Sequence, residues 1–214
     1  MSMSDTDGVR VPDSKMARAI TELLRDVTSE LLFHHSSRVF LWGALTGERR
    51  RLRFDPELLY AAAMFHDIGL TPRYRGSKLR FEVDGANAAR DFLRQYGVPE
   101  ASLELVWDAV ALHTTPGIPQ HKKPEVALLN AGVEMDVLGL AYRDFTDDER
   151  DAVVRAHPRG PDFKHDIIAA FYTGMRHRPE STFGTMNDDV LAFKDPSFQR
   201  TDFCALILGS DWPR

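Results

Sequence analysis

The stretch DPELLYAAAMFHDIGL, residues 55–70, decides the fold. Asp55 is a residue type that caps helices, and Pro56 suits the first helical position. Apolar residues then recur at helical spacing as far as His66, and Gly69 follows where a helix would end. The stretch therefore predicts a helix whose apolar face ends in an ionisable side chain.

The rest of the chain predicts more helices of the same kind. No segment alternates apolar and polar residues as a half-buried strand would, so we expect an all-α, single-domain helical bundle of about seven to nine helices. Residues 1–12 are expected to be a flexible tail, and 13–214 one domain with its site core at about 30–140 and a C-terminal helical extension at 141–214. The other expected helices begin near Ser14 and span Glu82–Tyr96, Pro99–His113, Pro124–Leu138, a segment capped by Thr146 and Glu149, and Phe163–Met175.

Four of the expected helices deliver an ionisable side chain to the core. Positions three, four and seven apart share a helix face, so each apolar stripe can be followed to its end. The stripe Ile20, Leu24, Val27 and Leu31 leads to His35; Leu59, Ala62 and Ala63 lead to His66; Leu103, Val106 and Val110 lead to His113; and Val126, Leu129 and Val133 lead to Asp136.

One such histidine alone is typical of a hydrogen-bonded core residue. As a group, these side chains need compensation, because an unpaired buried charge costs on the order of 5 kcal/mol. A divalent cation held by imidazoles and carboxylates would satisfy all of them together, including Asp67 beside His66. A second pair, His165-Asp166, has no matching partners in the sequence, and we interpret it as structural.

Composition limits the alternatives. The chain of 214 residues is 43% hydrophobic and 28% charged, with no run near the ~18 apolar residues that a membrane span needs. The N-terminus lacks an export signal, so a cytoplasmic location is the default expectation. A single cysteine, Cys204, excludes an internal disulfide or a thiolate metal cage. The net charge of −5 argues against nucleic-acid or membrane partners. The arginine-rich run 48–53 is expected to be a solvated loop between two helices, with steering of an anionic substrate or a partner contact as the alternative.

The order His35, His66-Asp67, Asp136 resembles the HD superfamily of metal-dependent hydrolases. More narrowly, the strings HHSSRVFLWG, AAAMFHDIGL, RFEVDGANAAR and AVALHTTPG look like the cyanamide hydratase branch of that superfamily, with His34 standing where an asparagine is usual. The likeness covers residues 30 to about 140.

The resemblance implies a role for each site residue. His35, His66, Asp67 and Asp136 would be the metal ligands, with zinc as the expected ion and iron or manganese as alternatives. His113 would lie beside the open coordination position, and Glu82 and Asp84 would flank the same pocket. Leu70 stands where the nucleotidase-like branch has a catalytic glutamate and the cyclic-dinucleotide phosphodiesterases have a lysine, which disfavours both branches and a two-metal site.

These features predict an enzyme that activates water with a metal against a small polar molecule, such as a nitrile like cyanamide, giving urea. Glu82 or Asp84 would relay a proton, although acids in the first turn of a helix also favour its dipole. The alternative is hydrolysis of a nucleotide or other phosphomonoester, with phosphate bound by Arg73, Arg75 and Lys78. A third possibility is a binding domain stapled by a metal with a closed ligand shell. The apolar segment 203–208 could pair copies of the chain into a homo-oligomer.

Overall fold

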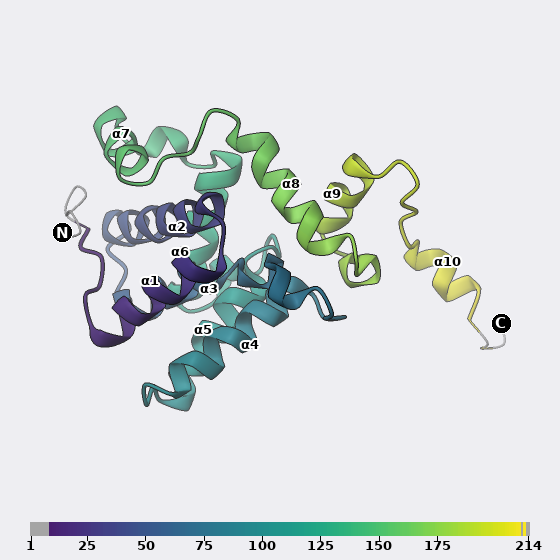
Figure 1. Ribbon diagram of the computed structural model, residues 1–214, viewed down its shortest axis with the longest axis horizontal. Coiled ribbons are helices and arrows are strands. Elements are labelled where there is room, and N and C mark those ends of the chain that lie inside the picture. Colours follow the sequence, from purple (N-terminus) through teal and green to yellow (C-terminus); the bar gives the residue numbers. More distant parts are fainter. Residues whose placement is uncertain (1–8, 211, 213–214) are drawn as a thin grey trace.

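The computed structural model describes residues 9–210 and 212. The expected all-α class is confirmed: the described residues form ten α-helices joined by turns and loops, with no strand (Figure 1). This is one helix more than the expected upper number. The α-helices are α1 (Lys15–Val27), α2 (Glu30–Arg49), α3 (Pro56–Phe65), α4 (Phe81–Arg94), α5 (Glu100–Leu112), α6 (Pro124–Val133), α7 (Asp147–Ala156), α8 (Phe163–Met175), α9 (Asn187–Lys194) and α10 (Phe203–Leu208).

The helix that contains His35 differs from the expected one. The apolar stripe from Ile20 to His35 was expected to lie on a single helix, but α1 ends at Val27 and α2 begins at Glu30. Thr28 has an extended backbone, and Ser29 caps α2 by accepting a hydrogen bond from the backbone N–H of Leu32 at 3.3 Å. The chain changes direction at this break, so that α2 runs through the centre of the bundle.

Helix α2 is buried from Leu32 to Gly47 except at His34, and it packs against α3 and α6. The crossing with α6 is close: a Cβ atom on Gly132 would lie 2.2 Å from the carbonyl oxygen of Val39. Only glycine permits that approach, which brings the end of α6 to the side of α2 that carries His35.

The start of α3 agrees with the sequence. The Asp55 carboxylate caps it by accepting from the backbone N–H groups of Glu57 and Leu58, with Pro56 at the first position. The capping box of Thr146 and Glu149 at α7 is likewise present. The expected helix 124–138 is continuous but changes form, because its last turn, Glu134–Leu138, is a π-helix that contains Asp136.

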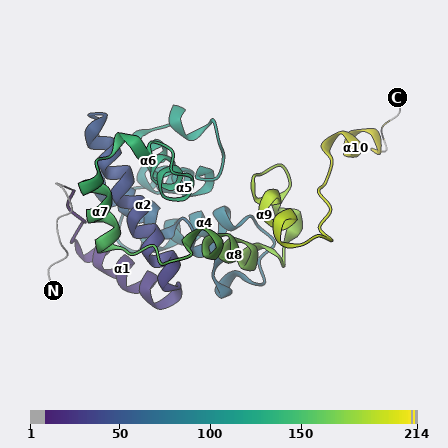
Figure 2. The ribbon, with the colours of Figure 1, turned by 90° about the horizontal axis from the view of Figure 1, so that it is seen from above.

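Helices α8 and α9 extend the bundle on one side (Figures 1 and 2). They share a small apolar cluster with the start of α2 and the turn after α3, formed by Leu32, Leu70, Phe81, Phe163, Ile167, Met175 and Leu191. Helix α10 lies away from the rest (Figure 2), and its large apolar side chains Phe203, Leu206, Ile207 and Leu208 are exposed. Self-association through 203–208 therefore stays a prediction.

The N-terminal boundary lies earlier than expected. Residues 1–8 of the expected tail lie outside the described residues, but Val9 is buried at 3% exposure within the main core. The folded chain thus extends before residue 13. None of the helices that the structure describes is long and apolar enough to cross a membrane.

Candidate metal centre

Three side chains from two elements meet at the centre of the bundle. His35 comes from the second turn of α2, while His66 caps the C-terminus of α3 and Asp67 follows it. One ligand atom of each lies within 4.8 Å of the others, and all three residues are buried. Gly69 allows the chain to turn here, because a Cβ atom on it would lie 2.0 Å from the carbonyl oxygen of Phe81.

The imidazoles at this point are oriented by acceptors on their far sides. Nδ1 of His66 lies 2.6 Å from the carbonyl oxygen of Ala63, and Nδ1 of His113 lies 2.6 Å from that of Val110. A carbonyl only accepts, so each Nδ1 carries a proton, and in the neutral ring each Nε2 presents a lone pair to the interior. The histidines at the C-termini of α3 and α5 are thus both oriented by a hydrogen bond from Nδ1 to the carbonyl oxygen three residues earlier.

Asp67 is the observation that tests whether a metal fits. Its carboxylate is buried, and neither oxygen has a hydrogen-bond partner. The nearest polar atoms are Nε2 of His66 at 3.3 Å and Nε2 of His35 at 3.5 Å, and these two nitrogens are 3.2 Å apart. Ligands about 2.0–2.2 Å from a tetrahedral ion lie roughly 3.3–3.6 Å from one another. The donor set therefore fits a divalent ion such as zinc, which would compensate the unpartnered carboxylate.

The pKa shifts within the cluster favour a charged carboxylate beside imidazole. Burial raises the pKa of Asp67, but the surrounding imidazoles of His66, His113 and His35 together outweigh burial and hold that pKa well below its usual range. Burial lowers the pKa of His35 and favours its neutral form, whereas for His66 the charge of Asp67 and its hydrogen bonds outweigh burial and raise the pKa. An ion bound here would replace the proton on His66, because metal ligands are an anionic carboxylate and neutral imidazole.

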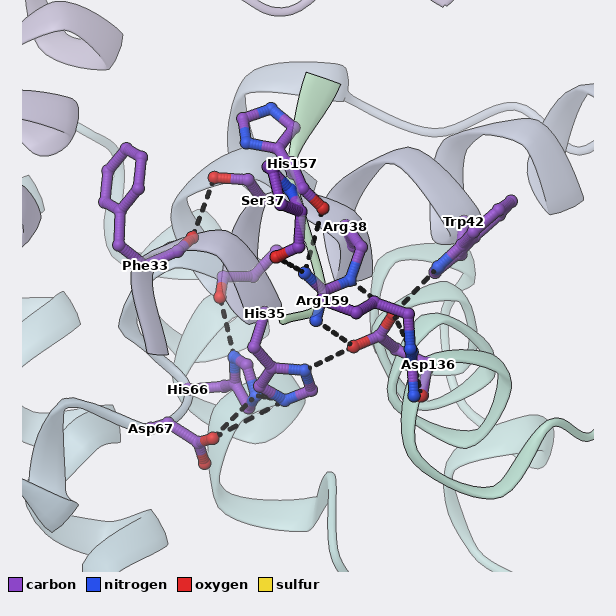
Figure 3. Close-up of polar contacts among 12 residues, drawn as sticks. Phe33, His35, Ser37, Arg38, Trp42, His66, Asp67, Asp136, His157 and Arg159 are labelled. Atoms are coloured by element: carbon purple, nitrogen blue, oxygen red, sulfur yellow. Dashed lines mark hydrogen bonds and ion pairs between the residues drawn. The ribbon is translucent and has the colours of Figure 1, made fainter. Parts of the chain in front are cut away.

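Asp136 lies on the side of the His35 ring opposite to Asp67 (Figure 3). Its Oδ2 is 2.7 Å from Nδ1 of His35 and accepts from Nη2 of Arg38 at 2.9 Å. Its Oδ1 accepts from Nε of Arg38 at 2.8 Å, Nη1 of Arg159 at 3.0 Å and Nε1 of Trp42 at 3.1 Å.

This arrangement differs from the expected ligand role of Asp136. Five donors occupy a carboxylate with about four lone-pair sites, and the His35 ring separates it from Asp67. The structure thus brings Asp136 to the cluster as the partner that orients His35, while His35, His66 and Asp67 form the group whose ligand atoms converge.

The sequence did not identify the residues that hold Asp136. Arg38 and Trp42 lie three and seven positions after His35, so helical periodicity already placed them on the same face of α2. Arg159 has no such signal, because it reaches the site from the loop between α7 and α8.

Comparison with known families agrees with this geometry. The model of the HD domain matches residues 32–154, more than half of the 214 residues, and the match includes both His35 and the His66-Asp67 pair. The chain belongs to the HD-domain family. HD domains generally bind divalent metals and act as metal-dependent hydrolases. No match was found among curated proteins.

A cavity of about 240 Å³ opens over the three candidate ligands of this HD domain. His35, His66 and Asp67 line it together with His113, whose Nε2 lies 3.6 Å from Oδ1 of Asp67. His113 therefore lies beside the donor group, on the side that faces the cavity.

Glu82 and Asp84, the other two expected catalytic residues, have different surroundings in this HD domain. Glu82 is fully buried behind the cavity wall, where its Oε1 accepts from the Thr114 hydroxyl, from Nδ2 of Asn187 at 2.9 Å and from Nη2 of Arg80 at 2.8 Å. Burial raises the pKa of Glu82, but the hydrogen bond from Arg80, the neighbouring His113 ring, the charge of Arg80 and the hydrogen bond from Thr114 together outweigh burial, so the pKa lies below its ordinary value.

Asp84 is engaged by partners outside the cavity. Its carboxylate accepts from Ser77 at 2.9 Å and pairs with Arg178, a fully buried residue that also donates to the carbonyl oxygen of Gly69 at 2.6 Å. Asp84 is not among the residues that line the cavity. The structure therefore gives Asp84 a structural ion pair and leaves its expected proton-transfer role without a geometric basis.

Proposed function

We propose that this HD-domain protein is a metal-dependent hydratase or hydrolase that activates water against a small uncharged molecule. A nitrile such as cyanamide, hydrated to an amide or to urea, is the leading substrate type, in line with the sequence likeness to the cyanamide hydratase branch. Zinc is the leading ion, because two imidazoles and one carboxylate form the donor set.

One observation carries the proposal: the three candidate ligands form the floor of a cavity. A catalytic metal site keeps at least one coordination position open, whereas a structural site is closed by protein ligands. Here the converging set has three members, and space for a small molecule lies beside it. This favours catalysis over a metal that only staples helices.

The chain's own residues supply the proton transfers. A divalent ion, when bound, provides the Lewis acidity that makes water nucleophilic at neutral pH. Nε2 of His113 faces the cavity with a free lone pair, so it accepts a hydrogen bond from water or substrate. Glu82 is ionised and reaches the cavity through the Thr114 hydroxyl, which donates to it. Thr114 and Glu82 thus form a route for a proton leaving the attacking water.

The phosphomonoester alternative has less support. The residues proposed to bind phosphate, Arg73, Arg75 and Lys78, lie in the segment after the HD turn, and none of them lines the cavity. Arg73 instead borders a separate depression with Tyr74 and Asp91. Phosphoryl transfer depends on cations placed around the phosphate, so their location disfavours that reaction.

A substrate panel tests the proposal. Metal-loaded protein is incubated separately with cyanamide, small alkyl nitriles and a set of nucleotides, and urea, amide and inorganic phosphate are measured. We expect urea or amide and no phosphate. Glu82→Gln should keep its metal and lose roughly 10²–10⁴-fold in kcat. Phosphate release from a nucleotide, with no turnover of the nitriles, would overturn the proposal.

A further inference from the structure

The cavity over the metal-site residues has a polar floor and apolar walls. His35, His66, Asp67 and His113 form the floor, and the walls are mostly carbon. The apolar lining residues are Phe81, Pro116, Val133, Val137, Leu138, Leu140, Phe171, Met186 and Val190. Such a division suits a ligand with one polar end and one apolar end.

The charges of the lining residues disfavour a ligand with an anionic body. Among the described lining residues there is no arginine or lysine, whereas two are acidic, Asp67 and Glu134. Thr114, Asn130 and Asn187 are the other polar members. Away from an ion at the floor, an anionic group would lie against walls without a cationic side chain and at a cost in desolvation, so the walls favour an uncharged body of the ligand.

Part of the apolar wall comes from outside the region that matches the HD family. Phe171 belongs to α8, Met186 immediately precedes α9, and Val190 lies on α9, all beyond residue 154. Leu138, Leu140 and Met186 are 61%, 51% and 42% exposed, so they form an apolar rim where the cavity meets solvent.

Two buried contacts fix this wall relative to the floor. Nδ2 of Asn187, the first residue of α9, donates to Glu82 at the start of α4. Arg178, between α8 and α9, donates to the carbonyl oxygens of Gly69 at 2.6 Å and Leu79 at 2.9 Å. The wall is therefore attached to the turn that carries Asp67, and its shape is set independently of the three candidate ligands.

We infer that the substrate is an uncharged molecule whose polar, reacting end lies at the metal-site residues and whose apolar body packs against Phe171, Met186 and Val190. The α8–α9 segment is then the part of the chain that selects the substrate. This rests on the proposed function, because it takes the floor of the cavity as the metal site. A substrate as small as cyanamide would leave the apolar wall without contacts, so longer nitriles should be preferred.

Alkyl hydroxamates test this inference without catalysis. The hydroxamate group chelates a metal that has an open position, and the effect of the alkyl tail on affinity measures its contact with the apolar wall. Binding of acetohydroxamate, butyrohydroxamate and hexanohydroxamate to the zinc-loaded full chain is measured by titration calorimetry. Each added methylene that enters the cavity should tighten Kd about threefold to fourfold. Succinate monohydroxamate, with an anionic tail, should bind more weakly than butyrohydroxamate.

Two variants on α9 link the effect to the wall. Val190→Phe should abolish the gain with tail length while acetohydroxamate still binds. Phe193→Ala, at a side chain that is 68% exposed and outside the cavity, is the matched control and should keep the wild-type gain. A Kd independent of tail length in the wild type, or the same gain in Val190→Phe, overturns the inference. If no hydroxamate binds the zinc-loaded protein, the open metal site itself fails, and the proposed function falls with it.

Discussion

His35 separates two buried carboxylates that are compensated in opposite ways. Asp136, on the Nδ1 side, accepts from Arg38, Trp42 and Arg159 as well as from His35. Asp67, on the Nε2 side, is equally buried at 2% exposure and has no hydrogen-bond partner. Because a buried carboxylate without compensation is strongly unfavourable, the contrast indicates which side of the ring is built for an ion.

The comparison also shows that burial and residue type do not define a metal ligand. Both aspartates follow an apolar helical stripe, and both have a pKa held below the usual range despite burial, Asp67 by His66 and Asp136 by the hydrogen bond from His35. What distinguishes them is the partner: permanent guanidinium cations lie beside Asp136, whereas Asp67 faces imidazoles, which can give up a proton and bind a metal instead.

The largest predicted effect comes from removing a donor on the Asp67 side. His66→Ala should reduce the metal content from about one ion per chain to near zero and abolish turnover, because two donors cannot hold the ion tightly. Metal analysis by mass spectrometry measures this. The matched control is His165→Ala, in the other His-Asp pair, where Nδ1 of His165 contacts the exposed Asp162 at 2.7 Å. Equal metal content in both variants would remove the basis for the site.

On the other side of the ring, Asp136→Ala should destabilise the fold by about 3–5 kcal/mol, because it leaves the buried guanidinium of Arg38 without its partner. Urea unfolding measures the change. Glu100→Ala breaks an exposed arginine–carboxylate pair with Arg94 and should cost about 0–1 kcal/mol. A loss of the same small size at both positions would show that the Asp136 network contributes little.

Neutralising Asp67 should cost stability even without an ion. After treatment with chelator, Asp67→Asn should lower the free energy of unfolding by about 1–3 kcal/mol, because the imidazoles around Asp67 hold its pKa below the usual range and so stabilise its charged form. The same substitution should abolish metal binding. Urea unfolding of both proteins after treatment with chelator gives the comparison. Equal or higher stability of the substituted chain would show that the imidazoles do not compensate the charge of Asp67.

The smallest predicted effect is a pH dependence on the Arg38 side. Burial, followed by the charge of His34 and Arg38, lowers the pKa of His157 from 6.5 to about 4. Between these values the unfolded chain binds a proton that the folded chain does not, so stability falls as pH decreases from about 6.5 toward 4.

Between pH 7 and pH 5 the His157 contribution to the loss should be about 1–2 kcal/mol. His157→Gln should remove that part of the decrease. Thermal unfolding of the wild type and of His157→Gln at pH 7 and pH 5 measures it. An equal loss of stability in the two proteins would refute the role of His157.

Much of the site could be predicted from local pattern. The cap at Asp55 and the apolar stripe to His66 depend on neighbouring residues, and the sequence predicts them. The break at Thr28 and Ser29 was missed, because apolar spacing continues across it although both residue types favour helix ends.

Contacts between residues far apart in the chain could not be predicted from the sequence. Asp136 is held by Arg159 from a loop, and Glu82 is tied to Asn187, 105 residues away. Such contacts decide which buried carboxylate faces the candidate metal site and which one pairs with arginine. No helical periodicity encodes them. The ligand role of Asp136 was inferred from order along the chain, whereas the geometry assigns it to support His35.

The most direct test of the central claim is anomalous X-ray diffraction from crystals of the zinc-loaded protein, with data collected on both sides of the zinc absorption edge. The account predicts one peak about 2.0–2.2 Å from Nε2 of His35, Nε2 of His66 and the Asp67 carboxylate, with Asp136 still paired to Arg38. A peak bonded to Asp136, or no peak between His35 and Asp67, would contradict it.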